Sequence, residues 1–196
     1  MYLADQLWNV RVGTPTREEL LDRCVEFHGH LCLGQVLGLR LALLGMELVG
    51  TRDPKEMIVF IENDRCICDA IQIITGARIG RRSAKLIDYG KMAATFVNTQ
   101  SGNAYRVNVR HIDPNARHSK EAIRQVLHTP DAELLKWRRV AVFLKPEDLP
   151  GKPRRTANCA RCGEKVFDGK EVQGDAGPVC LPCAQGSYYE IVEEGE

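Results

Sequence analysis

The sequence predicts an α+β fold, with helices packed on an antiparallel-rich sheet, followed by a small C-terminal module. Helical stretches, with apolar residues three or four positions apart, are mixed with short stretches typical of strands, two of which fit a hairpin. The pattern lacks a regular strand–helix–strand alternation, which favours α+β over α/β. The module is indicated by four cysteines between residues 159 and 183.

Two helices are predicted near the N-terminus. Thr16 and Glu19 have the spacing of a capping box, and the apolar-periodic run that they open ends near Gly29. The following stretch, Leu33–Val49, is apolar on nearly all sides. Since a helix of that kind is enclosed by other elements, we expect Leu33–Val49 to be the buried central helix of the core.

A strand and a third helix come next. Met57–Ile61 is short, rich in β-branched residues and bounded by turn-forming residues, which is typical of a buried strand. Cys66–Thr75 is predicted to be a helix that stops at Gly76. Residues 81–85 carry three cations and are interpreted as a solvated loop.

A hairpin, two helices and a closing strand are predicted for the second half of the core. The hairpin pairs residues 92–97 with Ala104–Val109, where apolar and polar residues alternate, so one face of this sheet is expected to be solvated. Helices are expected at 119–127 and 131–137, and the closing strand at 140–144.

Prolines and a glycine between residues 145 and 158 exclude a regular helix and predict a domain boundary. Residues 1–149 are predicted to form the α+β core domain, and residues 150–196 a linker and a finger. The finger contains two Cys-x-x-Cys pairs, 17 residues apart, which is the spacing of a tetrahedral zinc site in a treble-clef or zinc-ribbon finger. These ligands are Cys159, Cys162, Cys180 and Cys183.

The finger is expected to have a structural role. A site with four thiolate ligands has no open position, so its zinc replaces a hydrophobic core that so short a segment cannot build. Four redox-active thiols are the alternative. Residues 151–196 contain six Lys or Arg and eight Asp or Glu, which argues against nucleic acid as a partner and favours protein contact.

The net charge, the apolar stretches and the cysteine content favour a cytoplasmic protein. The formal net charge is +1, so no strong overall field attracts nucleic acid or an anionic membrane. Residues 1–8 lack the pattern of a secretory signal, and the apolar stretch 36–49 is too short to cross a bilayer, so we expect no membrane partner. Eight cysteines in such a chain favour metal ligation or reactive thiols in a reducing compartment, and we expect a cytoplasmic protein.

A second candidate site is the His-Gly-His-x-Cys segment between the first two helices. His28, His30 and Cys32 are transition-metal ligand types, and in an extended segment alternate residues project to one side. We therefore predict a second metal there; helix capping or hydrogen bonding by the two histidines is the alternative. Cys32 precedes a helix, whose dipole is expected to lower the pKa of its thiol.

Further candidate residues follow the Met57–Ile61 strand. Cys66 is expected in the first turn of the next helix, with Asp69 on the same face and Cys68 pointing elsewhere. If the two clusters converge, they form a pocket in which Cys32 or Cys66 is the nucleophile and Asp69 a base. Cys24 and Cys68 are interpreted as small core residues.

These segments together resemble the FmdE family, which takes its name from formylmethanofuran dehydrogenase, over most of residues 16 to 110. The residues that carry the resemblance are Phe27-His28-Gly29-His30-Leu31-Cys32-Leu33-Gly34, Gly38, Arg40, Glu62, Cys66, Asp69-Ala70-Ile71-Gln72, Thr75-Gly76, Gly80 and Asp88-x-Gly90-Lys91. The resemblance implies an α+β core, a homodimer and a metal-binding or active-site pocket. Many members have a further cysteine where Ala77 and Arg78 stand here, so a mechanism that needs that thiol is open to question in this chain.

Three functions are consistent with these observations. The leading hypothesis is a metal-binding accessory protein in one-carbon, methanogenesis-type metabolism or in the metabolism of molybdenum or tungsten enzymes, with the polypeptides of such a dehydrogenase as candidate partners. The second is a stand-alone metal- or thiol-dependent enzyme that uses the His-Gly-His-x-Cys pocket. The third is a regulatory adaptor that binds protein or nucleic acid through its zinc finger.

Overall fold

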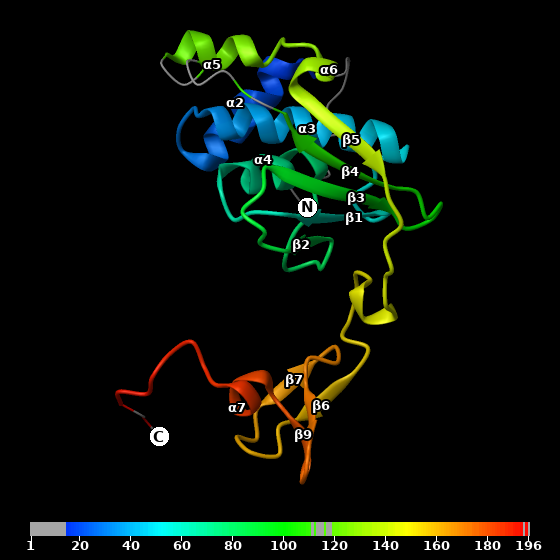
Figure 1. Cartoon of the computed structure of the whole chain (residues 1–196), viewed down its shortest axis with the longest axis vertical. Helices are drawn as coiled ribbons and strands as arrows, with labels where there is room; N and C mark the ends of the chain where they lie inside the picture. Colours follow the sequence, from blue (N-terminus) through cyan, green and yellow to red (C-terminus); the bar gives the residue numbers. More distant parts are fainter. Residues whose placement is uncertain (1–14, 111, 113–115, 117–118, 194, 196) are drawn as a thin grey trace. The chain divides into compact units, whose positions relative to one another are not determined.

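The computed structural model describes residues 15–110, 112, 116, 119–193 and 195. The chain divides into two compact units, residues 1–143 and 144–196, which we call the core unit and the finger unit and describe separately. The predicted α+β class is confirmed, because the core unit combines helices with one five-stranded sheet (Figure 1). None of the described helices combines the length and apolar character that a bilayer span requires. Residues 1–8, on which the prediction about secretion rests, lie outside the described part.

The first two helices begin and end where the sequence predicts. Helix α2, Arg17–His28, opens on a complete capping box, in which the Glu19 amide donates to Thr16 Oγ1 (3.2 Å) and the Thr16 amide to Glu19 Oε2 (2.8 Å). It ends at Gly29, whose φ of 91° lies in the left-handed region that glycine adopts without strain. Helix α3, Leu33–Val49, is the buried central helix, as predicted.

The sheet has the strand order β2-β1-β3-β4-β5. Its strands are β1 (Met57–Ile61), β2 (Ala84–Leu86), β3 (Ala93–Asn98), β4 (Ala104–Val109) and β5 (Leu135–Arg139). Strands β1 and β2 are parallel, and the other neighbours are antiparallel. Arg81 and Arg82 lie in a turn, but Lys85 belongs to β2 and not to the predicted solvated loop. The three residues of β2 carry too little pattern to be recognised, and pairing with β1 holds them as a strand.

Helix α4, Cys66–Thr75, packs closely on α3, and with α2 they cover one face of the sheet (Figure 1). The close approach depends on two glycines of α3. A Cβ atom at Gly38 would lie 2.7 Å from Ala70 Cβ, and one at Gly34 would lie 2.8 Å from Cys66 Cβ. The two glycines of α3 therefore allow the first turn of α4 to pack directly against α3.

The chain between residues 131 and 144 differs from the prediction. Helix α6 is only four residues long, Asp131–Leu134, and β5 follows where the helix 131–137 was expected to continue. Pairing with β4, in the register Val109↔Leu135 to Tyr105↔Arg139, overrides the local helical pattern. The strand predicted at 140–144 is wrong, because β4 begins at Ala104 and offers no partner beyond Val140, whose amide bonds to Ala104 O (3.0 Å).

A buried arginine joins the second half of the core to α3. The predicted helix at 119–127 is α5, Lys120–Val126, with Ser119 as its N-cap. Arg40, 1% exposed on α3, donates to the Val126, Leu127 and Thr129 carbonyls and to Asp131 Oδ1 (2.5 Å). Carbonyls at a helix end lack partners within the helix, so Arg40 both caps α5 and fixes the start of α6.

Candidate metal centres

Three ligand side chains converge where α2 ends and where α3 and α4 begin. His28 is the last residue of α2, Cys32 is the N-cap of α3, and Cys66 is the first residue of α4. One ligand atom from each lies within 4.8 Å of the other two. We call this group the core cluster. The two segments singled out in the sequence therefore meet in the fold.

The imidazole of His28 is oriented by Asp69. His28 Nδ1 lies 2.8 Å from Asp69 Oδ2, one turn beyond Cys66 on α4. The other ring nitrogen, Nε2, is buried and has no hydrogen-bond partner among the described residues. When Nδ1 carries the proton that Asp69 accepts, Nε2 presents a free lone pair, as in histidine ligands whose second nitrogen is held by a carboxylate. A buried acceptor without a partner is costly, and a metal ion would satisfy it.

His30 does not belong to the core cluster. Its ring lies beside that of His28, with centroids 4.6 Å apart, and its side chain is exposed. The chain from His28 to Cys32 is not extended, because Gly29 turns it in the left-handed conformation. Alternate residues of this segment therefore do not share one side, and Cys66 joins His28 and Cys32 instead.

Burial has the largest effect on the pKa of Cys32. It raises the pKa of the Cys32 thiol, the neighbouring Cys66 raises it further, and the amides of Gln35 and Gly34 partly oppose both effects. The prediction that the start of α3 lowers this pKa is wrong, because desolvation of the thiolate outweighs the helix end. A metal ion would have to displace the proton of Cys32 in order to bind it.

Two further residues of α3 shape the core cluster. Gln35 is completely buried, and its Nε2 donates to the carbonyl of Cys66 (2.6 Å). Gly34 leaves room for Cys66, as described above. Neither role was predicted from the sequence, although a glycine in the first turn of a buried helix is a signal of close helix contact.

The remaining core cysteines lie apart from the core cluster. Cys24 is buried in the hydrophobic core, as predicted, and burial raises the pKa of its thiol to about 12. Cys68 is half-buried on α4, where Gln72 Nε2 lies 3.5 Å from its sulfur. Burial also raises the pKa of Cys68. Neither thiol is placed to serve as a ligand of the core cluster.

The finger unit brings Cys159, Cys162, Cys180 and Cys183 together, with their sulfurs within 4.8 Å of one another. The first pair lies in the turn between β6 (Thr156–Asn158) and β7 (Lys165–Phe167). The hairpin of β8 (Val172–Gly174) and β9 (Gly177–Val179) leads to the second pair at the start of α7 (Leu181–Gln185). This arrangement fits a zinc finger.

Backbone amides prepare the finger for a metal. The amides of Arg161 and Cys180 donate to Cys159 Sγ, at 3.4 and 3.3 Å. Together with the amide of Cys162, they lower the pKa of Cys159 to about 6. Cys183 lies against the other three sulfurs, which raise its pKa to about 12. Four sulfurs so close together need a cation between them before all can ionise.

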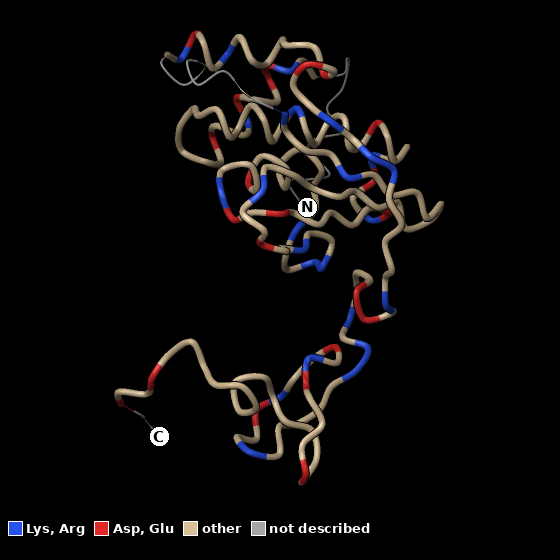
Figure 2. Tube along the Cα trace, viewed as in Figure 1, with Lys and Arg blue, Asp and Glu red and all other residues tan. Residues whose placement is uncertain are grey.

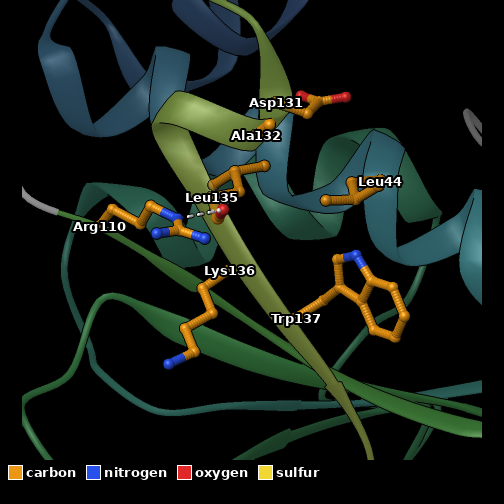
Figure 3. A pocket seen from close by; sticks show the side chains of 7 residues that line it. All are labelled: Leu44, Arg110, Asp131, Ala132, Leu135, Lys136 and Trp137. Atoms are coloured by element: carbon orange, nitrogen blue, oxygen red, sulfur yellow. Dashed lines mark hydrogen bonds between the residues drawn. The ribbon is translucent and has the colours of Figure 1, made fainter.

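A separate pocket of about 340 Å³ lies between α3 and β5 (Figure 3). It is lined by Leu44, Arg110, Asp131, Ala132, Leu135, Lys136 and Trp137, and Arg110 Nε donates to the carbonyl of Leu135 (2.9 Å). None of these residues belongs to the core cluster or to the four cysteines of the finger.

Comparison with known proteins agrees with this architecture. A curated relative from Archaeoglobus fulgidus, described as a probable S-adenosyl-L-methionine-binding protein, is 28% identical over 206 residues, which cover 90% of this chain and 55% of the relative. The chain thus spans about half the length of that relative. A crystal structure of a tungsten formylmethanofuran dehydrogenase FmdE-like protein from Syntrophus aciditrophicus shares the fold, with a TM-score of 0.63 and 22% identity, covering 90% of this chain and 96% of that one. The family model described as FmdE, molybdenum formylmethanofuran dehydrogenase operon, matches residues 27–141, and the chain therefore belongs to the FmdE family.

Proposed function

We propose that this protein is a metal-binding accessory protein of one-carbon metabolism, or of the metabolism of molybdenum or tungsten enzymes. It holds zinc in the finger and a second transition metal in the core cluster. Two observations support the second metal best: His28, Cys32 and Cys66 converge, and the buried Nε2 of His28 lacks a hydrogen-bond partner among the described residues.

The chemistry of the three side chains limits which metal ions the core cluster could bind. One imidazole nitrogen and two sulfurs suit zinc and other ions that prefer nitrogen and sulfur over oxygen. His28 and the two thiols would hold the ion, and Asp69 would keep the imidazole in position. Such an ion would act as a Lewis acid toward a ligand in its remaining position.

The test is elemental analysis of the full-length protein and of two single variants. We expect two metal ions per chain in the wild type, and one in each of Cys66→Ser and Cys162→Ser. The matched control is Cys68→Ser, which removes a thiol from α4 outside both clusters and should keep two ions. A Cys66→Ser protein with as much metal as the wild type would contradict the core site.

The accessory role is tested in the host. Deletion of the gene should lower the activity of the formylmethanofuran dehydrogenase or of other molybdenum and tungsten enzymes, and the wild-type gene, but not Cys66→Ser, should restore it. Unchanged activity of all these enzymes would contradict the role. The homodimer implied by family membership is tested by light scattering of the purified protein.

A stand-alone enzyme is the second candidate, and one observation favours it. The core cluster offers three protein ligands, and catalytic zinc sites typically have three protein ligands and one open position. Cys66 would serve as the nucleophile of this site. Asp69, which already contacts His28, would hold the imidazole in position. Turnover of a screened small substrate that is lost in Cys66→Ser and retained in Cys162→Ser would support this function, whereas equal turnover in both would contradict it.

A further inference from the structure

A cationic groove lies on the core unit, apart from both cysteine clusters. It has a volume of about 760 Å³ and lies over the ends of β1, β3, β4 and β5. Of its ten lining residues, four are cations, Lys91, Arg106, Lys136 and Arg138, and Glu62 is the single carboxylate. Its volume lies within the range of about 300–1,000 Å³ that small-molecule sites occupy.

The charge of Glu62 is neutralised within the groove. Its buried carboxylate accepts two parallel hydrogen bonds from Arg106, Nε to Oε1 and Nη2 to Oε2, both 2.7 Å. Lys91, Lys136 and Arg138 have no ion pair with any residue that the structure describes, and the ammonium of Lys91 lies 5.6 Å from the ring centre of Tyr89. Three positive charges therefore remain without an opposite charge in this part of the chain.

The strand register places these cations side by side. Arg106 on β4 pairs directly with Arg138 on β5, and Asn108 pairs with Lys136. Figure 2 shows the cations along β5, and in Figure 3 the side chains of Lys136 and Trp137 leave this strand in opposite directions. Lys136 and Arg138 are two residues apart on β5 and therefore project from the same face of the strand, where a bound anion would reduce the repulsion between them.

The groove is also tied to the beginning of α4. Asn63, 3% exposed, donates from Nδ2 to the carbonyl of Lys91 (2.8 Å) and accepts at Oδ1 from the amide of Arg65 (3.1 Å). Arg65 is the N-cap of α4, and Cys66 follows it. The position of Lys91 is therefore fixed by the same turn that positions a ligand of the core cluster.

We propose that this groove binds a small organic anion that carries two or more negative charges on phosphate or carboxylate groups. The guanidinium of Arg138 can bind such a group through two hydrogen bonds, and the two lysines add point charges. Tyr89 and Met92 supply an apolar wall for the remainder of the molecule. The proposal is independent of the metal content of the core cluster.

The test is calorimetric titration of the full-length protein with two probes, pyrophosphate for phosphate groups and tricarballylate for carboxylates. We expect saturable binding of one probe per chain, weakened at least about ten-fold by Lys136→Gln/Arg138→Gln, because two charge-assisted contacts are lost. Both residues are exposed, so the variant should remain folded. The matched control, Lys55→Gln/Lys120→Gln, removes two exposed cations outside the groove and should change the affinity less than about two-fold.

The outcomes separate the groove from the metal site. Binding that survives in Cys66→Ser and is lost in Lys136→Gln/Arg138→Gln supports the proposal. The probe that binds with the higher affinity then identifies the anionic group. The proposal is overturned if neither probe saturates at millimolar concentration, if the control variant loses as much affinity, or if Cys66→Ser alone abolishes binding.

Discussion

One thiol of each cysteine cluster shows a contrast: the pKa of Cys159 in the finger is lowered, and that of Cys32 in the core cluster is raised. In the finger, backbone amides donate to Cys159 and lower its pKa to about 6, so that thiol is ready to bind a cation. In the core cluster, burial raises the pKa of Cys32. Among its described residues, the finger has almost no buried apolar residues besides its cysteines, whereas the core cluster lies at three helix ends beside a continuous hydrophobic core.

This contrast teaches that similar ligands can have different dependence on the ion. The core cluster rests on α2, α3 and α4, which share one continuous hydrophobic core with the sheet. In the finger, the buried apolar cluster contains only Cys159, Val179 and Cys180 among the described residues, so two of its three buried residues belong to the four-cysteine cluster. Loss of the metal should therefore unfold the finger and leave the core unit folded.

The largest expected effect is on the finger. Cys162→Ser should abolish the tertiary structure of residues 156–185, because a structural zinc contributes on the order of 10 kcal/mol to so small a module. Amide NMR spectra should show collapsed dispersion for the finger and unchanged peaks for the core unit. Cys68→Ser is the control, and native dispersion of the finger in Cys162→Ser would show that the two clusters do not differ in this way.

The next effect is on the packing of α3 against α4. Gly38→Ala would place a Cβ atom 2.7 Å from Ala70 Cβ and 2.8 Å from the carbonyl of Ile67, so the helices must move apart. We expect a loss of about 1–3 kcal/mol in the free energy of unfolding of the core unit, measured with denaturant. Gly80→Ala, where a Cβ atom would meet nothing within 4 Å, should change it little. Equal losses in both variants would contradict the proposed contact.

A smaller effect is expected for Asp69→Asn, which should change the metal affinity of the core cluster without unfolding the core unit. Asp69→Asn retains a hydrogen-bond acceptor for His28 but loses the charge, and the core cluster should bind its metal about 10–100-fold more weakly. Competition with a chromophoric chelator measures this change, and the finger should be unaffected. Asp64→Asn, on the exposed turn before α4, is the control. An unchanged affinity in Asp69→Asn would remove Asp69 from the site.

A further effect, confined to alkaline pH, concerns the stability of the core unit. The pKa of Cys24 is raised from 9.0 to about 12 in the fold, so the unfolded chain loses this proton first as the pH rises. The free energy of unfolding should therefore be unaffected below pH 9 and fall between pH 9 and 12, by about 1.4 kcal/mol per pH unit at most. Cys24→Ala should show a shallower fall, and identical slopes in both proteins would contradict the shift.

The sequence predicts those elements whose signals are local. The capping box of Thr16 and Glu19, the apolar stretch Leu33–Val49 and the β-branched strand Met57–Ile61 each carry their own pattern, and the structure confirms them. Residues 131–144 were misassigned because the preference for a strand at Leu135–Arg139 comes from β4, 26 or more residues earlier in the chain.

The same division applies to the candidate sites. The finger can be predicted from spacing, because its two pairs are each close in sequence. The core cluster joins residues 38 positions apart, His28 and Cys66, and depends on the packing of α3 against α4. The ligand types pointed to this region, but only the fold shows that Cys66 meets His28 and that His30 does not join them.

The side chains that the core cluster and the finger offer to a metal would give the two loaded sites different charges. Two thiolates and one neutral imidazole balance a divalent ion, so a loaded core cluster is electrically neutral. Four thiolates around the same ion leave the finger with two excess negative charges. Metal loading should release a proton from each cluster thiol that is still protonated. At neutral pH this excludes Cys159, whose pKa is about 6, so the finger should release fewer than four protons.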